Sequence, residues 1–152
     1  MNKTKKIAIG SDHGGFELKN EVINYLQEMN WIYKDFGAYD TKSTHYPDYA
    51  LRVGKAIIDD EYQCGILICG TGIGMSIAAN KIKGIRASLC HDTFSAQMAK
   101  EHNNANVLTM GARVIGKGLA REIVRVWLMA EFSQESRHII RLQKVADIYE
   151  SC

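Results

Sequence analysis

The chain has 152 residues, of which 46% are hydrophobic, and its 19 Lys and Arg against 17 Asp and Glu give a net charge of +2 at pH 7. This length predicts a single domain, residues 1–152, whose core is large enough to fold without disulfide bonds. So small a net charge creates no field that attracts polyanions, and we therefore expect no nucleic-acid partner. The four cysteines show no CxxC spacing, so we expect reduced thiols and neither a disulfide framework nor a metal site.

The start of the chain is charged, but only Ile7-Ala8-Ile9 follows before the polar Ser11-Asp12-His13. An apolar run of this length is far too short for a signal-peptide core or a membrane span. We therefore expect a cytoplasmic protein with no membrane partner.

Further along the chain, short apolar runs alternate with longer helical patterns, which is the rhythm of repeated βαβ units. It predicts an α/β fold, a Rossmann-like three-layer sandwich with a five-stranded parallel sheet and helices on both faces. The expected strands are Lys6–Gly10, Trp31–Phe36, Gly65–Cys69, Ile85–Cys90 and Val107–Met110. After the last strand, Leu119 to Ala130 and Ser136 to Glu150 read as consecutive helices with no strand left to cover. We expect the C-terminal helix to pack on a partner subunit.

The most informative stretch follows the third expected strand, where Cys69 leads into Gly70-Thr71-Gly72-Ile73-Gly74. A helix-forming segment comes next, so this turn should expose free amides at a helix N-terminus and attract anions. It lacks the Lys-Ser/Thr of a P-loop and the third glycine of a dinucleotide fingerprint, and Met75 stands where a cysteine phosphatase has arginine. The alternative is a tight turn beside a cysteine that belongs to the core.

Polar residues also lie next to other strands of the expected sheet. Asp12 and His13 follow the first strand, Arg113 follows the fifth, and His102-Asn103 precedes the fifth, where it could fold over the same edge. Ligands bind at the carboxyl edge of such sheets, so these side chains are candidates for one site. Each also has a structural explanation: Asp12 as a helix cap, His102 as a helix end and Arg113 as a solvated surface residue.

The last expected helix carries a second group of charges, Arg137 and Arg141. Residues four apart share one helix face, where two guanidinium groups can converge on a phosphate. The alternative is a solvated basic face that pairs with Glu131, Glu135 or Asp147.

Taken together, these segments resemble the sugar-phosphate isomerase family that holds ribose-5-phosphate isomerase B and the galactose-6-phosphate and allose-6-phosphate isomerases. The matching segments are Ile9-Gly10-Ser11-Asp12-His13-Gly14-Gly15, Tyr46-Pro47-Asp48-Tyr49-Ala50, Ile68 to Lys81, Gly84-Ile85-Arg86-Ala87, His102-Asn103, Asn106-Val107-Leu108, Gly111-Ala112-Arg113-Val114 and the pair Arg137-His138 with Arg141. They follow the family order through nearly the whole chain, and the cysteine-glycine turn with its continuation is the most specific of them.

The resemblance implies an isomerase that interconverts D-ribose 5-phosphate and D-ribulose 5-phosphate, in the non-oxidative pentose phosphate pathway, through a cis-enediolate and without a metal or other cofactor. Cys69 matches the base of the cysteine-using branch, since other members have a glutamate where this chain has Met75. His102 matches the proton donor for ring opening, and Thr71 adds a hydroxyl beside the oxyanion. The implied substrate-binding residues are Asp12, His13, Gly70, Gly72, Ile73, Gly74, Asn103, Arg113, Arg137, His138 and Arg141.

In this family the site is shared between two subunits, so the resemblance also implies a homodimer, possibly a tetramer. One departure is Asn104, where many members carry an aspartate. Galactose 6-phosphate and allose 6-phosphate stay open as substrates. A non-catalytic sugar-phosphate sensor would need neither Cys69 nor His102, and a thiol oxidoreductase would need a resolving cysteine, for which Cys64 is badly placed.

Overall fold

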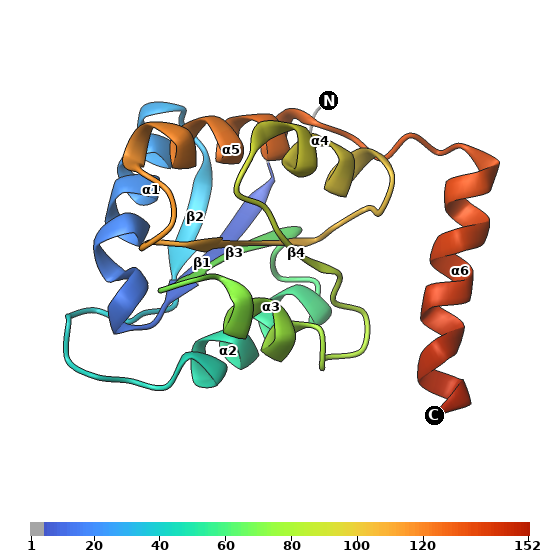
Figure 1. Ribbon diagram of the computed structural model, residues 1–152, viewed down its shortest axis with the longest axis horizontal. Helices are drawn as coiled ribbons and strands as arrows, with labels where there is room; N and C mark the ends of the chain where they lie inside the picture. Colours follow the sequence, from blue (N-terminus) through green and yellow to red (C-terminus); the bar gives the residue numbers. More distant parts are fainter. Residues whose placement is uncertain (1–4) are drawn as a thin grey trace.

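Five strands form one parallel sheet with helices on both faces in the computed structural model, which describes residues 5–152 (Figure 1). Residues 1–4, most of the charged start considered above, lie outside the described residues. The strands are β1 (Lys6–Ser11), β2 (Ile32–Asp35), β3 (Cys64–Cys69), β4 (Ala87–Leu89) and β5 (Val107–Gly111). The predicted architecture of the sheet and its two helical layers is confirmed.

The strand order β2-β1-β3-β5-β4 places a topological switch point between β1 and β3. From β1 the chain moves outward to β2, whereas after β3 it builds the other half of the sheet. The register pairs Ser11 with Ile68 and Cys69 with Gly111, so β1, β3 and β5 end at the same edge. Loops that leave this edge in opposite directions open a crevice, which is where open α/β sheets bind ligands.

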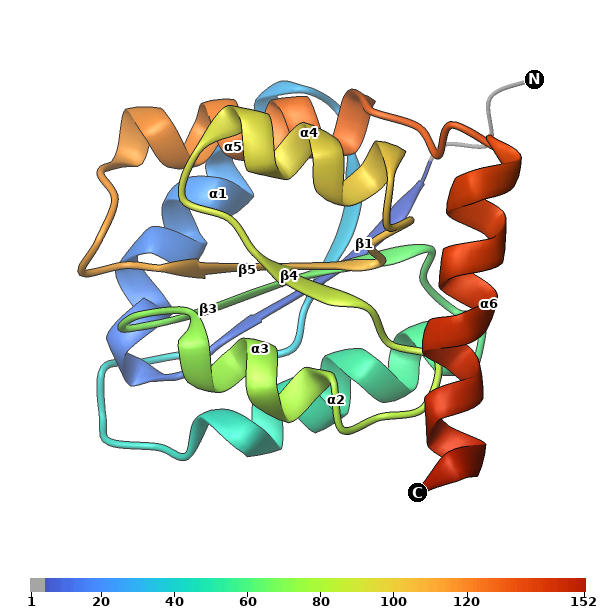
Figure 2. The ribbon, with the colours of Figure 1, turned by 45° about the vertical axis from the view of Figure 1, so that its right-hand side comes forward.

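One face of the sheet is covered by α1 (Phe16–Glu28), α4 (Thr93–Glu101) and α5 (Lys117–Met129), as Figures 1 and 2 show. Helix α5 illustrates why these segments are helical and where they pack. Its buried residues recur at intervals of three and four and form one apolar stripe toward the sheet, and they are Ala120, Ile123, Val124, Trp127 and Leu128.

The opposite face is covered by α2 (Tyr46–Ile58) and α3 (Ile73–Ala79). Pro47 lies in the first turn of α2, where its fixed φ and missing N–H suit a helix start. The connection between β2 and α2 therefore ends at His45. Because helices cover both faces, all six residues of β3 are buried.

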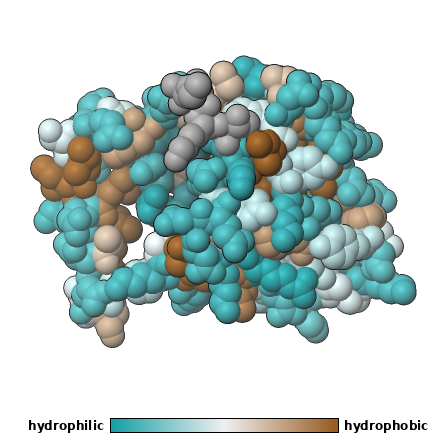
Figure 3. All heavy atoms as spheres, turned by 180° about the vertical axis from the view of Figure 1, so that it is seen from behind, coloured by the Kyte–Doolittle hydropathy of each residue, from teal (hydrophilic) through white to brown (hydrophobic). Residues whose placement is uncertain are grey.

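Helix α6 (Ser136–Ser151) stands beside the body of the molecule and covers neither face of the sheet (Figures 1 and 2). Within this helix only His138 is buried. A groove of ≈ 420 Å³ separates the helix from residues 83–86. Seen from behind, apolar side chains lie on the end of the molecule that α6 forms, at the left of Figure 3; the exposed ones in this helix include Ile139, Ile140, Val145 and Ile148. The tail thus has no strand of its own to cover, and its packing on a partner stays a prediction.

Two strands are shorter than the sequence predicts. β4 covers Ala87–Leu89 because it is an edge strand that, among the described strands, pairs with β5 alone. Gly84, with a φ of +91°, turns the chain before it. β2, at the other edge, pairs with β1 over four residues. Edge strands lack the second neighbour that would extend their pairing, which is why apolar content alone overestimates them.

Candidate functional site

Asp12 and His13 follow β1 at the switch point. Asp12 is 7% exposed. Its carboxylate accepts a hydrogen bond through Oδ1 from the Gly15 amide at 3.0 Å. The capping role considered for Asp12 is therefore confirmed, and Oδ2 has no hydrogen-bond partner among residues 5–152. The His13 amide donates to Thr44 Oγ1 at 3.2 Å, and the Thr44 amide donates to His13 Nδ1 at 3.1 Å. Both side chains are thus fixed at the carboxyl edge.

Cys69 ends β3 beside them and is 5% exposed. Its Sγ accepts a hydrogen bond from the Gly72 amide at 3.1 Å. Gly72 has a φ of +76°, and a β-carbon there would lie 2.6 Å from Leu89 Cδ1 and 2.8 Å from the Met110 carbonyl carbon. Only glycine fits this position, because both the left-handed backbone and the close contacts exclude a side chain. The glycine-rich turn is therefore shaped around the sulfur.

The turn also presents free hydrogen-bond donors. Ile73 N–H donates to Thr71 Oγ1 at 3.3 Å, whereas the amides of Thr71 and Gly74 have no acceptor among the described residues. Gly70 has its carbonyl bound to the Arg113 amide at 3.0 Å. Unpaired N–H groups grouped at a strand-to-helix turn form a pocket for negative charge. The glycine-rich turn that the sequence predicts at the start of a helix is therefore present, directly before α3.

Arg113 joins the same edge from β5. Its exposed guanidinium lies so close to Gly70 that a β-carbon added there would be 3.1 Å from Nη1. A β-carbon on Gly14 would be 3.7 Å from Nη2 of the same side chain. Arg113 is solvated, as the structural alternative holds, but it extends over the turns that carry Cys69 and His13. Arg113 therefore places a cation beside the cysteine turn.

His102 and Asn103 do not join this edge within one chain. They follow α4, and a helix that returns from one parallel strand to the next ends at the amino edge of the sheet. Cys69 pairs with Gly111, at the far end of β5 from Val107, and four strand residues span about 13 Å. The expectation that these residues fold over the carboxyl edge is wrong, because the direction of α4 fixes them at the opposite one.

At that opposite edge His102 stacks on His138 at the start of α6, with ring centroids 4.4 Å apart. Ser133 Oγ lies 2.7 Å from His138 Nδ1, and His138 is 3% exposed. Burial, followed by the charges of His102 and Arg137, lowers the pKa of His138 below its usual range. A neutral His138 ring is thus favoured, and it fixes the first turn of α6 against the end of α4.

Arg137 and Arg141 lie on this same helix and are both exposed. Arg137 Nε bonds Glu135 Oε2 at 2.7 Å, so the predicted pairing with an acidic neighbour is confirmed for this arginine. Within one chain neither arginine reaches the cysteine turn. The predicted site residues therefore form two groups at opposite edges, one around Cys69 and one around His102 and His138.

Three residues near the cysteine turn were not assigned from the sequence. Thr44 binds His13 on both sides, His91 Nε2 accepts from the Gly111 amide at 3.0 Å, and the Tyr46 ring lies against Gly74, where a β-carbon would be 2.7 Å from Cζ. No spacing in the sequence points to these three residues, because their contacts join loops that are distant in sequence. His91 follows β4 and Tyr46 is the first residue of α2, so both lie at the carboxyl edge, which is the one feature that points to them.

Among residues 5–152, no group of three or more His, Cys, Asp and Glu side chains is placed to hold a metal ion. Of the helices that the structure describes, none has both the length and the apolar content needed to cross a membrane.

Comparison with known proteins agrees with this geometry. Residues 7–145 match the family model described as Ribose/Galactose Isomerase. The chain is 46% identical over 144 residues to ribose-5-phosphate isomerase B of Escherichia coli K12, with 95% of this chain and 96% of the relative covered. It is 52% identical over 128 residues to D-erythrulose-4-phosphate isomerase of Pectobacterium atrosepticum, covering 83% and 84%.

A solved structure, that of ribose-5-phosphate isomerase B from Clostridium thermocellum, is similar over 96% of this chain and 98% of that chain, with a TM-score of 0.94 and 47% identity. The similarity thus extends over the sheet, both helical layers and the cysteine turn. The chain belongs to the ribose/galactose isomerase family.

Proposed function

We propose that this protein is a metal-independent aldose–ketose isomerase that interconverts D-ribose 5-phosphate and D-ribulose 5-phosphate, with Cys69 as the base. The observation that carries the proposal is the contact between Cys69 Sγ and the Gly72 amide at 3.1 Å, inside a turn that also presents free amides. The six residues from Cys69 to Gly74 thus combine a proton acceptor with free amides that can bind an anion. Family membership supplies the substrate class.

The proposed chemistry requires one proton to move between two neighbouring carbons. The Cys69 thiolate takes the proton from C2 of the open-chain aldose and returns it to C1, so no oxidant or reductant is consumed. Negative charge that develops on the oxygens of the cis-enediolate meets the amides of Thr71 and Gly74. The Thr71 hydroxyl lies at the same turn, and Asp12 has one carboxylate oxygen left for a sugar hydroxyl.

The other two buried thiols are poor candidates for the base. Burial raises the pKa of Cys64, and burial with the nearby Asp92 raises that of Cys90 to about 11. Cys64 also packs in the core under α1, α4 and α5, whereas Cys69 packs on the side of α2 and α3. A disulfide bond between Cys64 and Cys69 is therefore disfavoured, which argues against the oxidoreductase alternative.

The phosphate and the ring oxygen need groups that one chain does not bring to Cys69. We propose a homodimer in which the partner supplies the second group, His102 for ring opening and Asn103, Arg137, His138 and Arg141 for binding. Helix α6 supports this arrangement because it exposes apolar side chains and covers no strand of its own. Two-fold dimers are the commonest soluble oligomers, and a pair of such dimers would give a tetramer.

Substrate length is the least determined part of the proposal. The relative named D-erythrulose-4-phosphate isomerase, at 52% identity, favours a four-carbon phosphate as the second candidate. Galactose 6-phosphate and allose 6-phosphate are the alternatives within the family, and a non-catalytic sensor would bind sugar phosphates without turnover. The four free cysteines agree with a reducing compartment, and we propose the cytoplasm and a role in the pentose phosphate pathway.

The test is a turnover assay of the purified protein in excess EDTA with four substrates: ribose 5-phosphate, D-erythrulose 4-phosphate, allose 6-phosphate and galactose 6-phosphate. We expect ribose 5-phosphate to give the highest kcat/KM and EDTA to leave it unchanged. Preference for another phosphate would replace the substrate but keep the mechanism. Loss of turnover on chelation, restored by a divalent metal, would contradict the metal-independent mechanism, and binding without turnover would favour the sensor.

A further inference from the structure

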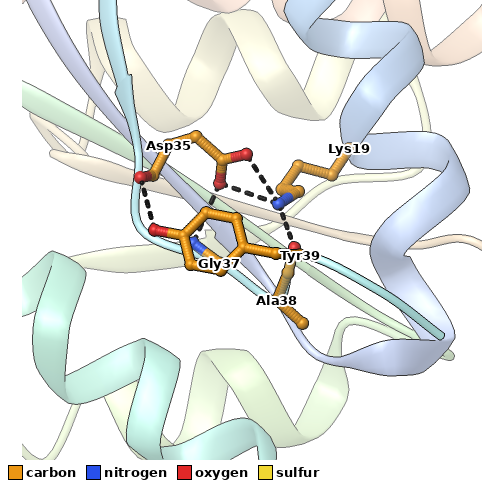
Figure 4. A network of polar contacts seen from close by, with 5 residues as sticks. All are labelled: Lys19, Asp35, Gly37, Ala38 and Tyr39. Carbon is orange, nitrogen blue, oxygen red and sulfur yellow. Dashed lines mark hydrogen bonds and ion pairs between the residues drawn. The ribbon is translucent and has the colours of Figure 1, made fainter. Parts of the chain in front are cut away.

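A lysine with no exposed surface anchors the loop between β2 and α2, residues 36–45. Lys19, in α1, is 0% exposed, and its ammonium donates to Asp35 Oδ1 at 2.7 Å, to Asp35 Oδ2 at 2.9 Å and to the Ala38 carbonyl (Figure 4). A buried ammonium is stable only when a counter-charge and acceptors surround it. This side chain therefore has a fixed position, and the residues that it binds are fixed with it.

The same carboxylate and backbone hold the first part of the loop. Gly37 N–H donates to Asp35 Oδ1 at 2.9 Å and Tyr39 OH donates to the Asp35 carbonyl at 3.1 Å, as Figure 4 shows. Gly37 and Ala38 also exchange two backbone hydrogen bonds with Ser11, each 2.6 Å long. Because Ser11 directly precedes Asp12, the anchored loop and the end of β1 form one rigid unit beside the candidate site.

The far end of this loop holds His13. Thr44 Oγ1 accepts from the His13 amide at 3.2 Å, and the Thr44 amide donates to His13 Nδ1 at 3.1 Å. A nitrogen that accepts a hydrogen bond carries no proton, so the neutral ring has its proton on Nε2. Nε2 has no hydrogen-bond partner among the described residues, which leaves it free to donate to a ligand.

We propose that Lys19 and Thr44 are positioning residues of the isomerase: Lys19 fixes the loop of residues 36–45, and Thr44 at its far end orients His13 as an Nε2–H donor toward the sugar phosphate. The proposal rests on the proposed function, because it assigns His13 to substrate binding. Neither Lys19 nor Thr44 touches the substrate. Their effect on binding passes through His13 and disappears when His13 cannot donate.

The chain offers a matched control in its second buried lysine. Lys100 is 9% exposed and its Nζ lies 4.0 Å from the centroid of the Trp127 ring, but the ammonium makes no ion pair or hydrogen bond among residues 5–152. It lies in α4 at the amino edge of the sheet, far from His13. Lys100→Met therefore removes the charge of a largely buried lysine, as Lys19→Met does, at a place that does not contact the loop.

The first measurement is a double-mutant cycle with ribose 5-phosphate, read as Kd by calorimetry and as KM. Lys19→Met and Thr44→Val should each raise Kd and KM about 3- to 10-fold with a smaller change in kcat, and Thr44→Ser should recover most of the loss. In a His13→Ala background, both substitutions should change Kd by less than about twofold. Lys100→Met should change it by less than about twofold in either background. Equal effects of Lys19→Met with and without His13 would overturn the proposal.

The second measurement does not depend on turnover. Nitrogen-15 shifts of the imidazole groups, assigned for His13 through the His13→Ala variant, report which ring nitrogen carries the proton. We expect Nε2–H in the wild type and a mixture of tautomers in Lys19→Met. An Nδ1–H tautomer in the wild type, or an unchanged one in a folded Lys19→Met protein, would contradict the assignment. If the protein isomerises none of the four sugar phosphates, the proposed function fails while this measurement still decides whether Lys19 and Thr44 orient His13.

Discussion

The two edges of the sheet differ in how completely one chain builds them. At the carboxyl edge, turns from β1, β3 and β5 contact one another directly, since Gly70 bonds Arg113 and Asp12 N–H bonds the Ile68 carbonyl. At the amino edge, His102 stacks on His138 in the first turn of α6, and most of that helix is exposed. At the carboxyl edge one chain brings its turns together, whereas at the amino edge it exposes side chains that have no substrate site of their own beside them.

This difference has a physical origin in the fold. Short turns after parallel strands converge by geometry, because all the strands end at one edge. By the same geometry, residues at the ends of the connecting helices lie at the opposite edge. They lie there even where the proposed mechanism needs them close to Cys69. A site that uses both groups is complete only when a second copy brings its amino edge to the first copy's carboxyl edge, which is the basis of the proposed dimer.

The largest effect is expected when the proposed base is removed from the carboxyl edge. Cys69→Ala should lower kcat by about 10²–10⁴-fold or more, because loss of a general base acts on the transition state, while sugar-phosphate binding should change less than about tenfold. Cys64→Ala, at the other end of the same buried strand, is the control and should keep most of its turnover. A Cys69→Ala enzyme with more than half of wild-type kcat would contradict the assignment of Cys69 as the base.

A second prediction concerns the unpaired charge at the amino edge. Burial lowers the pKa of Lys100 from 10.5 to about 8, so the folded chain binds fewer protons than the unfolded chain between these values. Below pH 8 both states are protonated, and the buried charge is destabilising throughout. Lys100→Met should therefore raise the free energy of unfolding by about 1–3 kcal/mol at pH 7, after allowance for the lost contact with Trp127.

Denaturant unfolding at several pH values checks the sign of that prediction. The advantage of Lys100→Met should shrink as the pH rises from about 8 toward 10.5, because the wild-type amine then loses its proton. The carboxyl-edge counterpart, Lys19→Met, should destabilise instead, since it leaves Asp35 without its partner. If both methionine variants lost stability equally, the distinction between a paired and an unpaired lysine would not hold.

The smallest expected effect is on the pH dependence of the α6 docking. The lowered pKa of His138 means that the unfolded chain binds more protons just below pH 6.5, so stability should fall as the pH drops through that range. His138→Phe keeps a ring against His102 but cannot titrate. Thermal unfolding of the two proteins should show a weaker fall for His138→Phe, and parallel curves would mean that His138 titrates as freely when folded.

Much of the carboxyl edge could be predicted from the sequence, because its information is local. Gly72 must be glycine because its backbone is left-handed and its neighbours leave no room for a side chain. Cys69 directly precedes the turn whose amide donates to its sulfur. The three central strands, β1, β3 and β5, also coincide with short apolar runs in the sequence. Such features involve residues a few positions apart, which is the range that spacing and periodicity report.

The rest depends on contacts between distant residues. His102 was placed at the wrong edge because sequence distance from β5 does not say which way α4 runs. The partners of His13 and Lys19 are 31 and 16 residues away, and nothing in the pattern of the loop singles out Thr44 or Asp35. Packing in three dimensions decides these contacts, so only the folded structure shows them.

The central claim, that the two edges of different copies make one site, is tested most directly by complementation. Inactive Cys69→Ala subunits are mixed with inactive Arg137→Ala/Arg141→Ala subunits under conditions that allow exchange, and mixed dimers are verified by mass. Half of the dimers are then mixed, and each has one site with both lesions and one with neither, so roughly a quarter of wild-type activity should return. If mixed dimers form and activity stays at the level of the parents, the arginines act on the cysteine of their own chain and the account of a shared site is contradicted.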